Sequence, residues 1–371
     1  MAARRKYART IAQAFDSLTL DGKQLEGIAA FLHFQALRNK RKKAEVWKES
    51  LYNLALELSL MSGRAISATT SGTTGPPKRI RVSRRDLVNS ARLTAVTFNL
   101  EEGDRVLLCL PCDFIAGKMM LVRAMAIGLD LHIIDPRGSV LDNLNVPDRF
   151  LFTAMVPLQL HRAIQEDRTR VEEQFDTILL GGGPVSAALE EDLQGLRTAV
   201  YQGYGSTETV THVAVRRING DTPSDHYSAI GRVSFSTDER GCLVVHTPHL
   251  TTKAHITNDL VELADDTHFR WLGRIDNVIL SGGKKIHPEQ LEAKTAGVIP
   301  YPHFFMAFPD DRLGEAVALV LETDRGSEEV LDEVLTALFS VLSEHELPRR
   351  VTALRSFLRT GSGKVVRRLV P

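Results

Sequence analysis

The sequence has little of several features that mark special classes of protein. Its 371 residues include only three cysteines, and this odd number argues against a framework of disulfide bonds. Lysine and arginine together number 46, as do aspartate and glutamate, so no excess charge points to nucleic acid or an acidic membrane as the main partner. No apolar run reaches the roughly 20 residues of a membrane span. The basic N-terminus lacks the apolar core of a signal peptide. We therefore expect a cytoplasmic protein.

The cysteines and histidines also lack the spacing of a metal site. Cys109 and Cys112 form a C-x-x-C motif, but Cys109 belongs to an apolar run and no second pair follows to complete a zinc site. His246, His249 and His255 are scattered along strand-like sequence without a carboxylate or cysteine at metal spacing. Structural roles explain these residues better than redox chemistry or metal binding.

What is present is an ordinary globular composition, 43% hydrophobic and 25% charged, at a length that fits two to three domains. Apolar residues at helical spacing predict helices over residues 1–62. From Ile66 onward, short apolar runs alternate with helical segments, which predicts an α/β domain with largely parallel strands. The predicted strands are Val106–Leu110, Leu131–Ile134, Thr177–Leu180 and Ala199–Tyr201, and the predicted helices include Asp86–Val96 and Val185–Leu196.

The last third of the chain changes in character. Short β-like segments such as Gly241–Thr247 and His268–Leu272 predict a small, mainly antiparallel β region. Pro288 suits the first turn of a helix through Lys294, and Ser327 is the predicted cap of a helix that ends before Pro348. We therefore predict a large N-terminal domain, residues 1–275, and a small α+β C-terminal domain, residues 276–371.

The segment Thr69–Lys78 is the most informative part of the sequence. It combines four threonines, a serine, two glycines and a lysine in ten residues. Backbone N–H groups, hydroxyls and a positive charge are what a loop needs to hold phosphates, although a polar surface loop has a similar composition. The order of a Walker phosphate loop is absent here, and Gly361–Lys364 lacks both the upstream glycine and the hydroxyl that would follow. A Walker-type NTPase is therefore disfavoured.

Two further segments each follow a predicted strand. Gly181–Pro184 would let a flat ligand approach the carboxyl end of a sheet, although a tight strand-to-helix turn also explains it. In Tyr201–Thr209, Tyr204 could stack on a base, Thr207 could donate to a phosphate and Glu208 could hold Mg²⁺. The order of these segments is stronger evidence than either segment alone.

The last two segments are Gly273–Asn277 with Ser281–Pro288, near the predicted domain junction, and Arg359–Lys364 near the C-terminus. A lysine among glycines can be brought to a site by domain movement. The alternative is a solvated basic tail, since Arg367 and Arg368 follow.

Taken in this order, the segments resemble the adenylate-forming superfamily of acyl- and aryl-CoA synthetases, adenylation domains and luciferases. The resemblance covers the chain from Ile66 to its C-terminus. It implies that family's fold: a large N-terminal α/β domain, here reduced at its N-terminus and carrying a small β region, and a small mobile α+β C-terminal domain. Asp276 resembles the hinge residue between them.

The resemblance also implies roles for individual residues. The phosphate loop would comprise Thr70, Ser71, Gly72, Thr73, Thr74 and Lys78. The adenine would be flanked by Gly181, Gly182, Gly183, Pro184, Tyr204 and the adjoining Gly205. Thr207 would contact the α-phosphate, Glu208 would ligate Mg²⁺, and Asp259, assisted by Arg274, would bind the ribose hydroxyls. Lys364 resembles the catalytic lysine of the first step, and Gly283 belongs to a loop that serves the second, thioester-forming conformation.

The implied reaction uses ATP, Mg²⁺ and coenzyme A. A carboxylate attacks the α-phosphorus of ATP, pyrophosphate leaves, and the thiol of coenzyme A then displaces AMP from the acyl-adenylate. Two anions must meet in the first step, so positive charge and hydrogen-bond donors are needed there. The partners are small molecules, a homodimer is compatible with the sequence, and neither nucleic acid nor a membrane span is expected.

Two features of the chain depart from the family pattern. The part before the phosphate loop is only about 68 residues, and Phe114 stands where many members have a histidine, so the gate for the carboxylate must differ. The compact length and the segment Ile115–Met120 with Arg123 resemble short o-succinylbenzoate–CoA ligases of menaquinone biosynthesis. That acid has a second carboxylate, which Lys118 or Arg123 would bind unless both are ordinary helix-surface charges.

Three other functions remain open. The chain could be a CoA ligase for another aryl or fatty acid, an adenylation enzyme that loads a carrier protein in trans, or a catalytically silent nucleotide-binding homologue. Lys364 and Glu208 argue against the silent form, because a binding module needs no mobile lysine.

Overall fold

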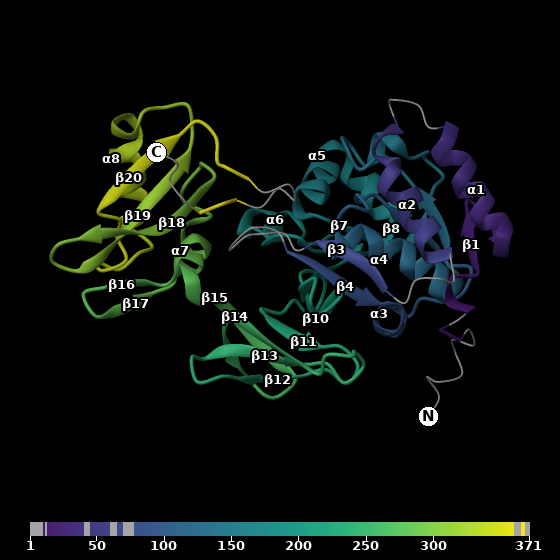
Figure 1. Ribbon diagram of the computed structural model, residues 1–371. Coiled ribbons are helices and arrows are strands. Elements are labelled where there is room, and N and C mark those ends of the chain that lie inside the picture. The colour runs from purple at the N-terminus through teal and green to yellow at the C-terminus, as the bar shows by residue number, and fades with distance from the viewer. Residues whose placement is uncertain are drawn as a thin grey trace. The chain divides into compact units, whose positions relative to one another are not determined.

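The computed structural model describes residues 10–11, 13–40, 45–59, 65–69, 78–359 and 365–367 (Figure 1). The chain forms two compact units. The first comprises Met1–Val185, Leu193–Ser234 and His246–His255, and the second comprises Ser186–Asp192, Phe235–Val245 and Ile256–Pro371. The predicted phosphate-loop residues Thr70–Thr74 and the predicted catalytic Lys364 lie outside the described residues.

The first unit is built on a largely parallel sheet, as predicted. Its strands run in the order β11-β10-β9-β8-β7-β5-β6-β1-β2. All pairs from β9 to β1 are parallel, whereas β11, β10 and β2 pair antiparallel with their neighbours. The strands are β1 (Ser17–Leu20), β2 (Lys23–Glu26), β5 (Arg105–Leu108), β6 (Asp130–Ile133), β7 (Phe150–Met155), β8 (Phe175–Leu180), β9 (Ala199–Gly205), β10 (His212–Arg217) and β11 (His226–Ala229).

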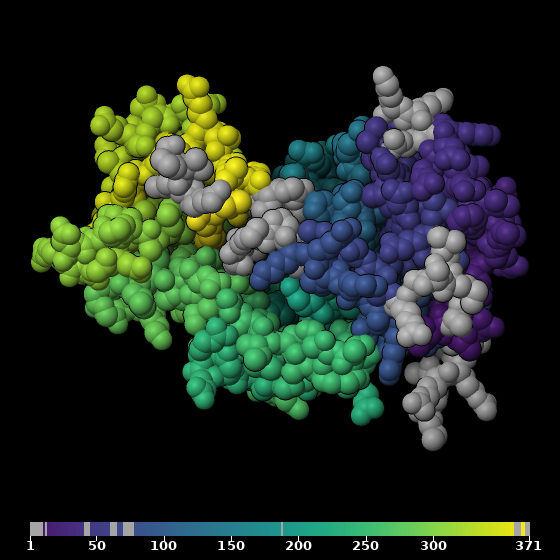
Figure 2. All heavy atoms as spheres, in the orientation of Figure 1, coloured from purple at the N-terminus to yellow at the C-terminus, as the bar shows by residue number. Residues whose placement is uncertain are grey.

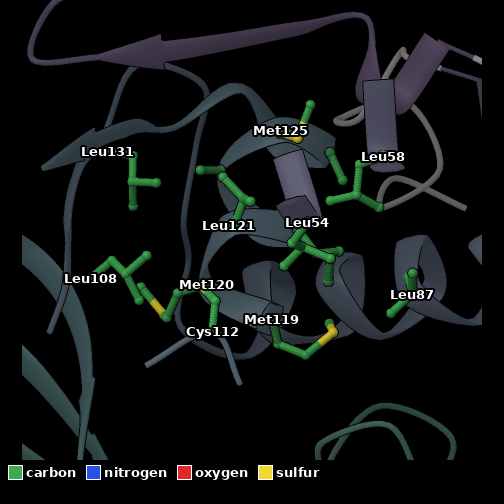
Figure 3. Packing of buried hydrophobic residues seen from close by; sticks show 14 of the residues in the cluster. Leu54, Leu58, Leu87, Leu108, Cys112, Met119, Met120, Leu121, Met125 and Leu131 are labelled. Atoms are coloured by element: carbon green, nitrogen blue, oxygen red, sulfur yellow. The ribbon is translucent and has the colours of Figure 1, made fainter. Parts of the chain in front are cut away.

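Helices of the first unit pack against this sheet around one apolar core (Figure 3). Met119, Met120 and Leu121 of α4 belong to this core together with Leu54 and Leu58 of α2, and all five are at most 2% exposed. The helices are α1 (Gly27–Lys40), α2 (Lys48–Ser59), α3 (Arg84–Thr97), α4 (Ile115–Arg123), its π-helical continuation Ala124–Gly128, and α5 (Pro157–Gln174), with short 3₁₀ turns at Gln13–Phe15 and Leu141–Asn143.

The purely helical N-terminus predicted for residues 1–62 is wrong, because a β-hairpin precedes α1. Asp21 and Gly22 have φ values of 47° and 75°, and Leu20 pairs directly with Lys23. An Asp-Gly pair with two positive φ angles makes the two-residue turn that suits a twisted hairpin. Leu18 and Leu25 face each other across the pair and are both buried. These first elements, drawn in purple, form part of the outer surface of their unit (Figure 2).

A separate hairpin flanks the predicted phosphate loop. Strands β3 (Ala65–Thr69) and β4 (Arg79–Ser83) pair antiparallel, with Thr69 opposite Arg79. The predicted phosphate loop lies between these two strands in the sequence. Ser83 caps α3, since its hydroxyl accepts a hydrogen bond from the Asp86 N–H.

The second unit combines two β regions with two longer helices. Strands β12 (Ser234–Thr237), β13 (Cys242–His246), β14 (Ala254–Leu263) and β15 (His268–Arg274) are neighbours in that order, and β14 and β15 pair antiparallel. The other strands are β16 (Ile279–Ser281), β17 (Lys284–Ile286), β18 (His303–Asp310), β19 (Gly314–Glu322) and β20 (Arg350–Leu354), and the helices are α6 (Ala187–Asp192), α7 (Pro288–Thr295) and α8 (Ser327–Phe339). Because β13 to β15 group with the C-terminal elements, the domain boundary at residue 275 stays a prediction.

Three predicted helices fall in this unit, and two of them differ in detail from the prediction. The helix from Pro288 is confirmed, whereas α6 is much shorter than the predicted Val185–Leu196. Ser327 is the first residue of α8 and not its cap, which is Gly326, because the Ser327 hydroxyl accepts a hydrogen bond from Ala353 N at 2.8 Å instead. No described helix is long and apolar enough to cross a membrane.

Candidate active site

The carboxyl ends of β7, β8 and β9 lie side by side in the first unit and carry two of the predicted segments. Gly181 N donates a hydrogen bond to Met155 O at 3.0 Å, and Gly183 O accepts from the side chain of Gln202 at 3.4 Å. Gly182 has a φ of 81°, which favours glycine. Open α/β sheets bind ligands at such strand ends, so the local geometry suits the predicted adenine site.

Tyr204 and Gly205 end strand β9 next to this turn. Tyr204 is half-buried, and its ring lies 5.7 Å from that of Tyr227 in an edge-to-face arrangement. Strand packing also explains why position 205 is a glycine, because a Cβ there would lie 2.2 Å from Thr211 O, just before β10. The close strand contact therefore requires glycine whether or not a nucleotide binds nearby.

The turn after β9 presents Thr207 and Glu208. Thr209 stabilises the turn, because its hydroxyl accepts from Ser206 N at 2.9 Å and donates to Thr211 O at 2.9 Å. In this hydrogen-bonded turn, the side chain of Thr207 is buried, whereas Glu208 is exposed. Val210 has a φ of 69°, a strained conformation for a β-branched residue, and such strain is typical of functional turns.

The environment of Glu208 fits the predicted magnesium role. Its carboxylate is exposed, and its charge acts on His255, where it opposes the lowering of that histidine's pKa by burial. Across the described residues, no cluster of three or more His, Cys, Asp or Glu could form a metal cage. Mg²⁺ in nucleotide enzymes is commonly held by one or two carboxylates and the substrate phosphates, so a single carboxylate is an adequate protein ligand.

In the second unit the predicted ribose and hinge residues form one network. Asp259 on β14 stands opposite Arg274 on β15, and Arg274 Nη1 lies 3.3 Å from Asp259 Oδ1. Arg274 Nη2 also donates to Asp276 Oδ2 at 2.8 Å, and the Asn258 amide lies 3.2 Å from both Asp276 oxygens. Burial opposes ionisation of Asp276, but Arg274 and Asn258 outweigh it and lower its pKa.

Gly283 lies in the turn between β16 and β17. It and Gly282 have φ values of 80° and 55°, and Ser281 pairs directly with Lys284. The two-residue hairpin explains both glycines. The role of Gly283 in a second conformation stays a prediction. Lys78, adjacent to β4, is exposed and is the one predicted phosphate-loop residue among those described.

Arg123, at the end of α4, is not the surface charge that a helix of this kind usually carries. It is 2% exposed, with hydrogen bonds to Thr94 Oγ1 at 3.2 Å, Thr211 Oγ1 at 3.1 Å and Met120 Sδ at 3.4 Å. Burial lowers its pKa to about 9, and among the described residues no carboxylate pairs with it. A buried cation of this kind, still charged at neutral pH, has its desolvation incompletely offset.

Neighbouring groups make the Arg123 surroundings polar without adding negative charge. His212 is buried, with Nδ1 3.3 Å from Thr211 Oγ1, and burial followed by the Arg123 charge lowers its pKa well below the usual value. Lys118, five residues before Arg123 on α4, lines a separate cavity of about 260 Å³ together with Asp113, Ser50 and Thr69.

The structure assigns the cysteines to the core, as predicted. Cys109 and Cys112 are buried, and burial raises the pKa of both thiols to about 12. Cys109 Sγ also lies 3.4 Å from Ala154 O.

Sequence reasoning missed three contributors to these sites. Asn258, directly before Asp259, was not predicted to hold the hinge aspartate, and Thr209 was not predicted to clamp its turn. The burial of Arg123 was also missed. Polar residues directly beside Asp259 and Glu208 were the available signal for the first two, whereas nothing local in the sequence indicates the burial of an arginine at the end of a helix.

Comparison with known proteins supports one family. The AMP-binding enzyme family matches residues 61–240. An acyl-CoA synthetase (AMP-forming)/AMP-acid ligase II-like protein from Dyadobacter fermentans is 35% identical in its crystal structure, with a TM-score of 0.59, over 90% of this chain and 96% of that one. The chain therefore belongs to the family of AMP-binding, adenylate-forming enzymes.

The names of two further relatives include succinylbenzoate as the acid. A 2-succinylbenzoate–CoA ligase from Bacillus subtilis is 27% identical over 280 residues, which are 67% of this chain and 57% of the ligase. The chain thus spans little more than half the length of that relative. The structure of Bacillus subtilis o-succinylbenzoate coenzyme A synthetase (MenE), in complex with ATP and a magnesium ion, has a TM-score of 0.73 at 19% identity over 98% of both chains, which shows the shared fold.

Proposed function

We propose that this protein activates a carboxylic acid with ATP to an acyl-adenylate and transfers the acyl group to coenzyme A. The observation that carries the proposal is the Arg274–Asp259 pair, with Asp276 on the same guanidinium, in a chain that belongs to the adenylate-forming family. The resemblance gives Asp259 and Arg274 as ribose residues and Asp276 as the hinge, and the contacts among these three residues support the proposal.

In this proposal, the residues have the following roles in ATP binding and catalysis. Asp259 accepts hydrogen bonds from the ribose hydroxyls, and Arg274 orients its carboxylate. Gly181–Pro184 and Tyr204 flank the adenine, while Thr207 donates to the α-phosphate. Thr70–Thr74 and Lys78 bind the β- and γ-phosphates. Glu208 would hold Mg²⁺, which neutralises phosphate charge when bound. Lys364 stabilises the charge that develops when the acid attacks.

We infer that the acid is o-succinylbenzoate or a close aryl diacid. Similarity to 2-succinylbenzoate–CoA ligase supports this inference, and so does Arg123, a buried cation without a carboxylate partner among the described residues. A second substrate carboxylate would supply the missing negative charge, and a charge-assisted pair in a dry site is strong. Lys118 is the other candidate for this contact, and Phe114, at the start of α4, changes the gate for the reacting carboxylate.

A screen of acid-dependent exchange between pyrophosphate and ATP, followed by addition of coenzyme A, tests the proposal. We expect exchange with o-succinylbenzoate and formation of its CoA thioester. Exchange only with another aryl or fatty acid would show that this acid, and not o-succinylbenzoate, is the substrate. Exchange without a thioester would favour a carrier protein as acceptor, and no exchange with any acid would favour a silent nucleotide-binding protein. A cytoplasmic location and a homodimer also stay proposals, to be tested by cell fractionation and sedimentation.

A further inference from the structure

Three neighbouring strands of the first unit carry a row of side chains that share one face of the sheet. Gln202 on β9 stands directly opposite Arg216 on β10, and the register of β10 with β11 continues the row to Tyr227. Directly opposed residues of paired strands lie on the same face. Tyr204 also lies on this face, because it is two residues after Gln202 on β9. The row therefore includes one of the residues proposed to flank the adenine.

Arg216 fixes the orientation of the Gln202 amide. Arg216 Nε donates a hydrogen bond to Gln202 Oε1 at 2.7 Å, and Gln202 Nε2 donates to Gly183 O at 3.4 Å. A guanidinium donates and never accepts, so it faces the amide oxygen and thereby aims the amide nitrogen at Gly183. Gln202 is 7% exposed, so water competes little for either contact. The Gly181–Pro184 turn is therefore connected to Arg216 through Gln202.

The same guanidinium also supports Tyr204. Its Cζ lies 5.8 Å from the centre of the Tyr227 ring, within the range of a cation–π contact. The Tyr227 ring lies 5.7 Å from that of Tyr204 in an edge-to-face arrangement. Arg216 Nη1 also approaches Ser224 O at 3.4 Å. Arg216 is therefore connected, through one intervening side chain in each direction, to both groups that flank the adenine in the proposed function.

We propose that Arg216 is a positioning residue for the adenine of ATP, and that it sets the spacing between the Gly181–Pro184 turn and the Tyr204 ring. The proposal rests on the function proposed above, in which these two groups flank the base. A planar guanidinium donates in its plane to Gln202 and presents its face to Tyr227, whereas a lysine ammonium has no such face. Without Arg216, the Gln202 amide can turn its oxygen towards Gly183 O, and the two oxygens repel each other.

The test compares Arg216→Met with wild type in calorimetric titrations with ATP and with adenosine, both without acid or coenzyme A. We expect the Kd for each ligand to rise about tenfold, because the charged donor that orients Gln202 is lost. Adenosine has no phosphate, so an equal rise for both ligands shows that the change acts on the base. A rise for ATP alone would show that Arg216 acts on the phosphates, and it would overturn the positioning role.

The ATP–pyrophosphate exchange reaction gives a second readout. In Arg216→Met the KM for ATP should rise about tenfold, whereas kcat and the KM for the acid should stay within about twofold. A variant that is only less stable would have a smaller active fraction and therefore a lower kcat. A lower kcat with an unchanged KM for ATP would thus contradict the proposal.

Arg217→Met is the matched control, because Arg217 is the next residue of β10 and makes the same kinds of contact on the other face of the sheet. Its Cζ lies 4.8 Å from the centre of the Tyr201 ring, and it donates to Tyr201 Oη at 2.9 Å and to Asn219 O at 2.7 Å. Both replacements remove one positive charge. The Kd values of Arg217→Met should stay within about twofold of wild type, and equal losses in the two variants would overturn the proposal.

Arg216→Lys keeps the charge and a donor but lacks the planar face, so its Kd for ATP should rise about three- to fivefold. It carries the test if a melting curve shows that Arg216→Met does not fold. An ATP affinity within about twofold of wild type in the variant that carries the test would overturn the positioning role. Wild-type protein that binds ATP but supports no exchange with any acid would overturn the proposed function alone. Wild-type protein that binds no ATP would overturn both.

Discussion

Arg274 joins Asp259 to Asp276, with one guanidinium nitrogen 3.3 Å from the first carboxylate and another 2.8 Å from the second. The predicted ribose ligand and the predicted hinge therefore share one cation. This cation fixes the Asp259 carboxylate before any nucleotide binds, and it also restrains the segment about which the C-terminal part would turn.

Replacement of Arg274 by Ala should weaken ATP binding more than it slows chemistry. A charge-assisted hydrogen bond contributes about 1.5–3 kcal/mol, so we expect the KM for ATP in the exchange reaction to rise about 10- to 100-fold. Arg270→Ala is the control, since Arg270 lies on the same strand and pairs with Glu262 at the surface. Its KM for ATP should stay within about twofold. Equal effects of both replacements would contradict a ribose role for the pair.

Arg123→Met should separate substrate binding from stability. Loss of the buried cation should raise the KM for the diacid by about tenfold or more and leave that for an aryl monoacid unchanged. Because Arg123 has no described carboxylate partner, its removal should leave the melting temperature unchanged or raise it. Lys118→Ala tests the other candidate in the same assay. An unchanged KM for the diacid in both variants would remove α4 from the acid site.

The strands of the first sheet could be predicted because buried parallel strands are continuous apolar runs, as at Val106–Leu108. The first hairpin was missed because Leu18 and its apolar neighbours also fit helical spacing, and the Asp21–Gly22 turn was overlooked. The segments that bear the site could likewise be placed, since glycines and hydroxyls directly after apolar runs mark strand ends.

Contacts between residues far apart in the sequence could not be predicted in this way. Glu292 and Arg367 are 75 residues apart, and no residue next to either of them in the sequence indicates that the two pair. The burial of Arg123 depends on Thr94 and Thr211 from two other elements. Charged residues are mostly exposed, so the sequence alone favours the surface for each of them.

The three cysteines should be unreactive in the folded protein. Burial raises the pKa of Cys109 and Cys112 to about 12, so almost no thiolate forms at these two residues at pH 8, and burial also raises the pKa of Cys242. A thiol reagent such as dithiobis(nitrobenzoate) should titrate none of them within minutes in buffer and all three in denaturant. Rapid reaction of the C-x-x-C pair, or one equivalent of tightly bound zinc, would show that this motif has a chemical role.

The Lys294–Glu346 pair should make the stability of the second unit depend on pH in the acid range. Burial alone would raise the pKa of Glu346, but hydrogen bonds from Lys294 and Ser343 outweigh it and lower the pKa to about 2. A carboxyl with a lowered folded-state pKa stabilises the fold above its unfolded value, here 4.5, and that contribution is lost as the pH falls towards 2. Since Lys294 is 45% exposed, screening by solvent limits the contribution to about 1 kcal/mol.

Lys294→Gln should therefore melt at a lower temperature than wild type at pH 7, and this difference in melting temperature should narrow below pH 4.5 and in high salt. A gap that is the same at pH 7 and pH 3 would show that the variant acts through packing and not through this charge.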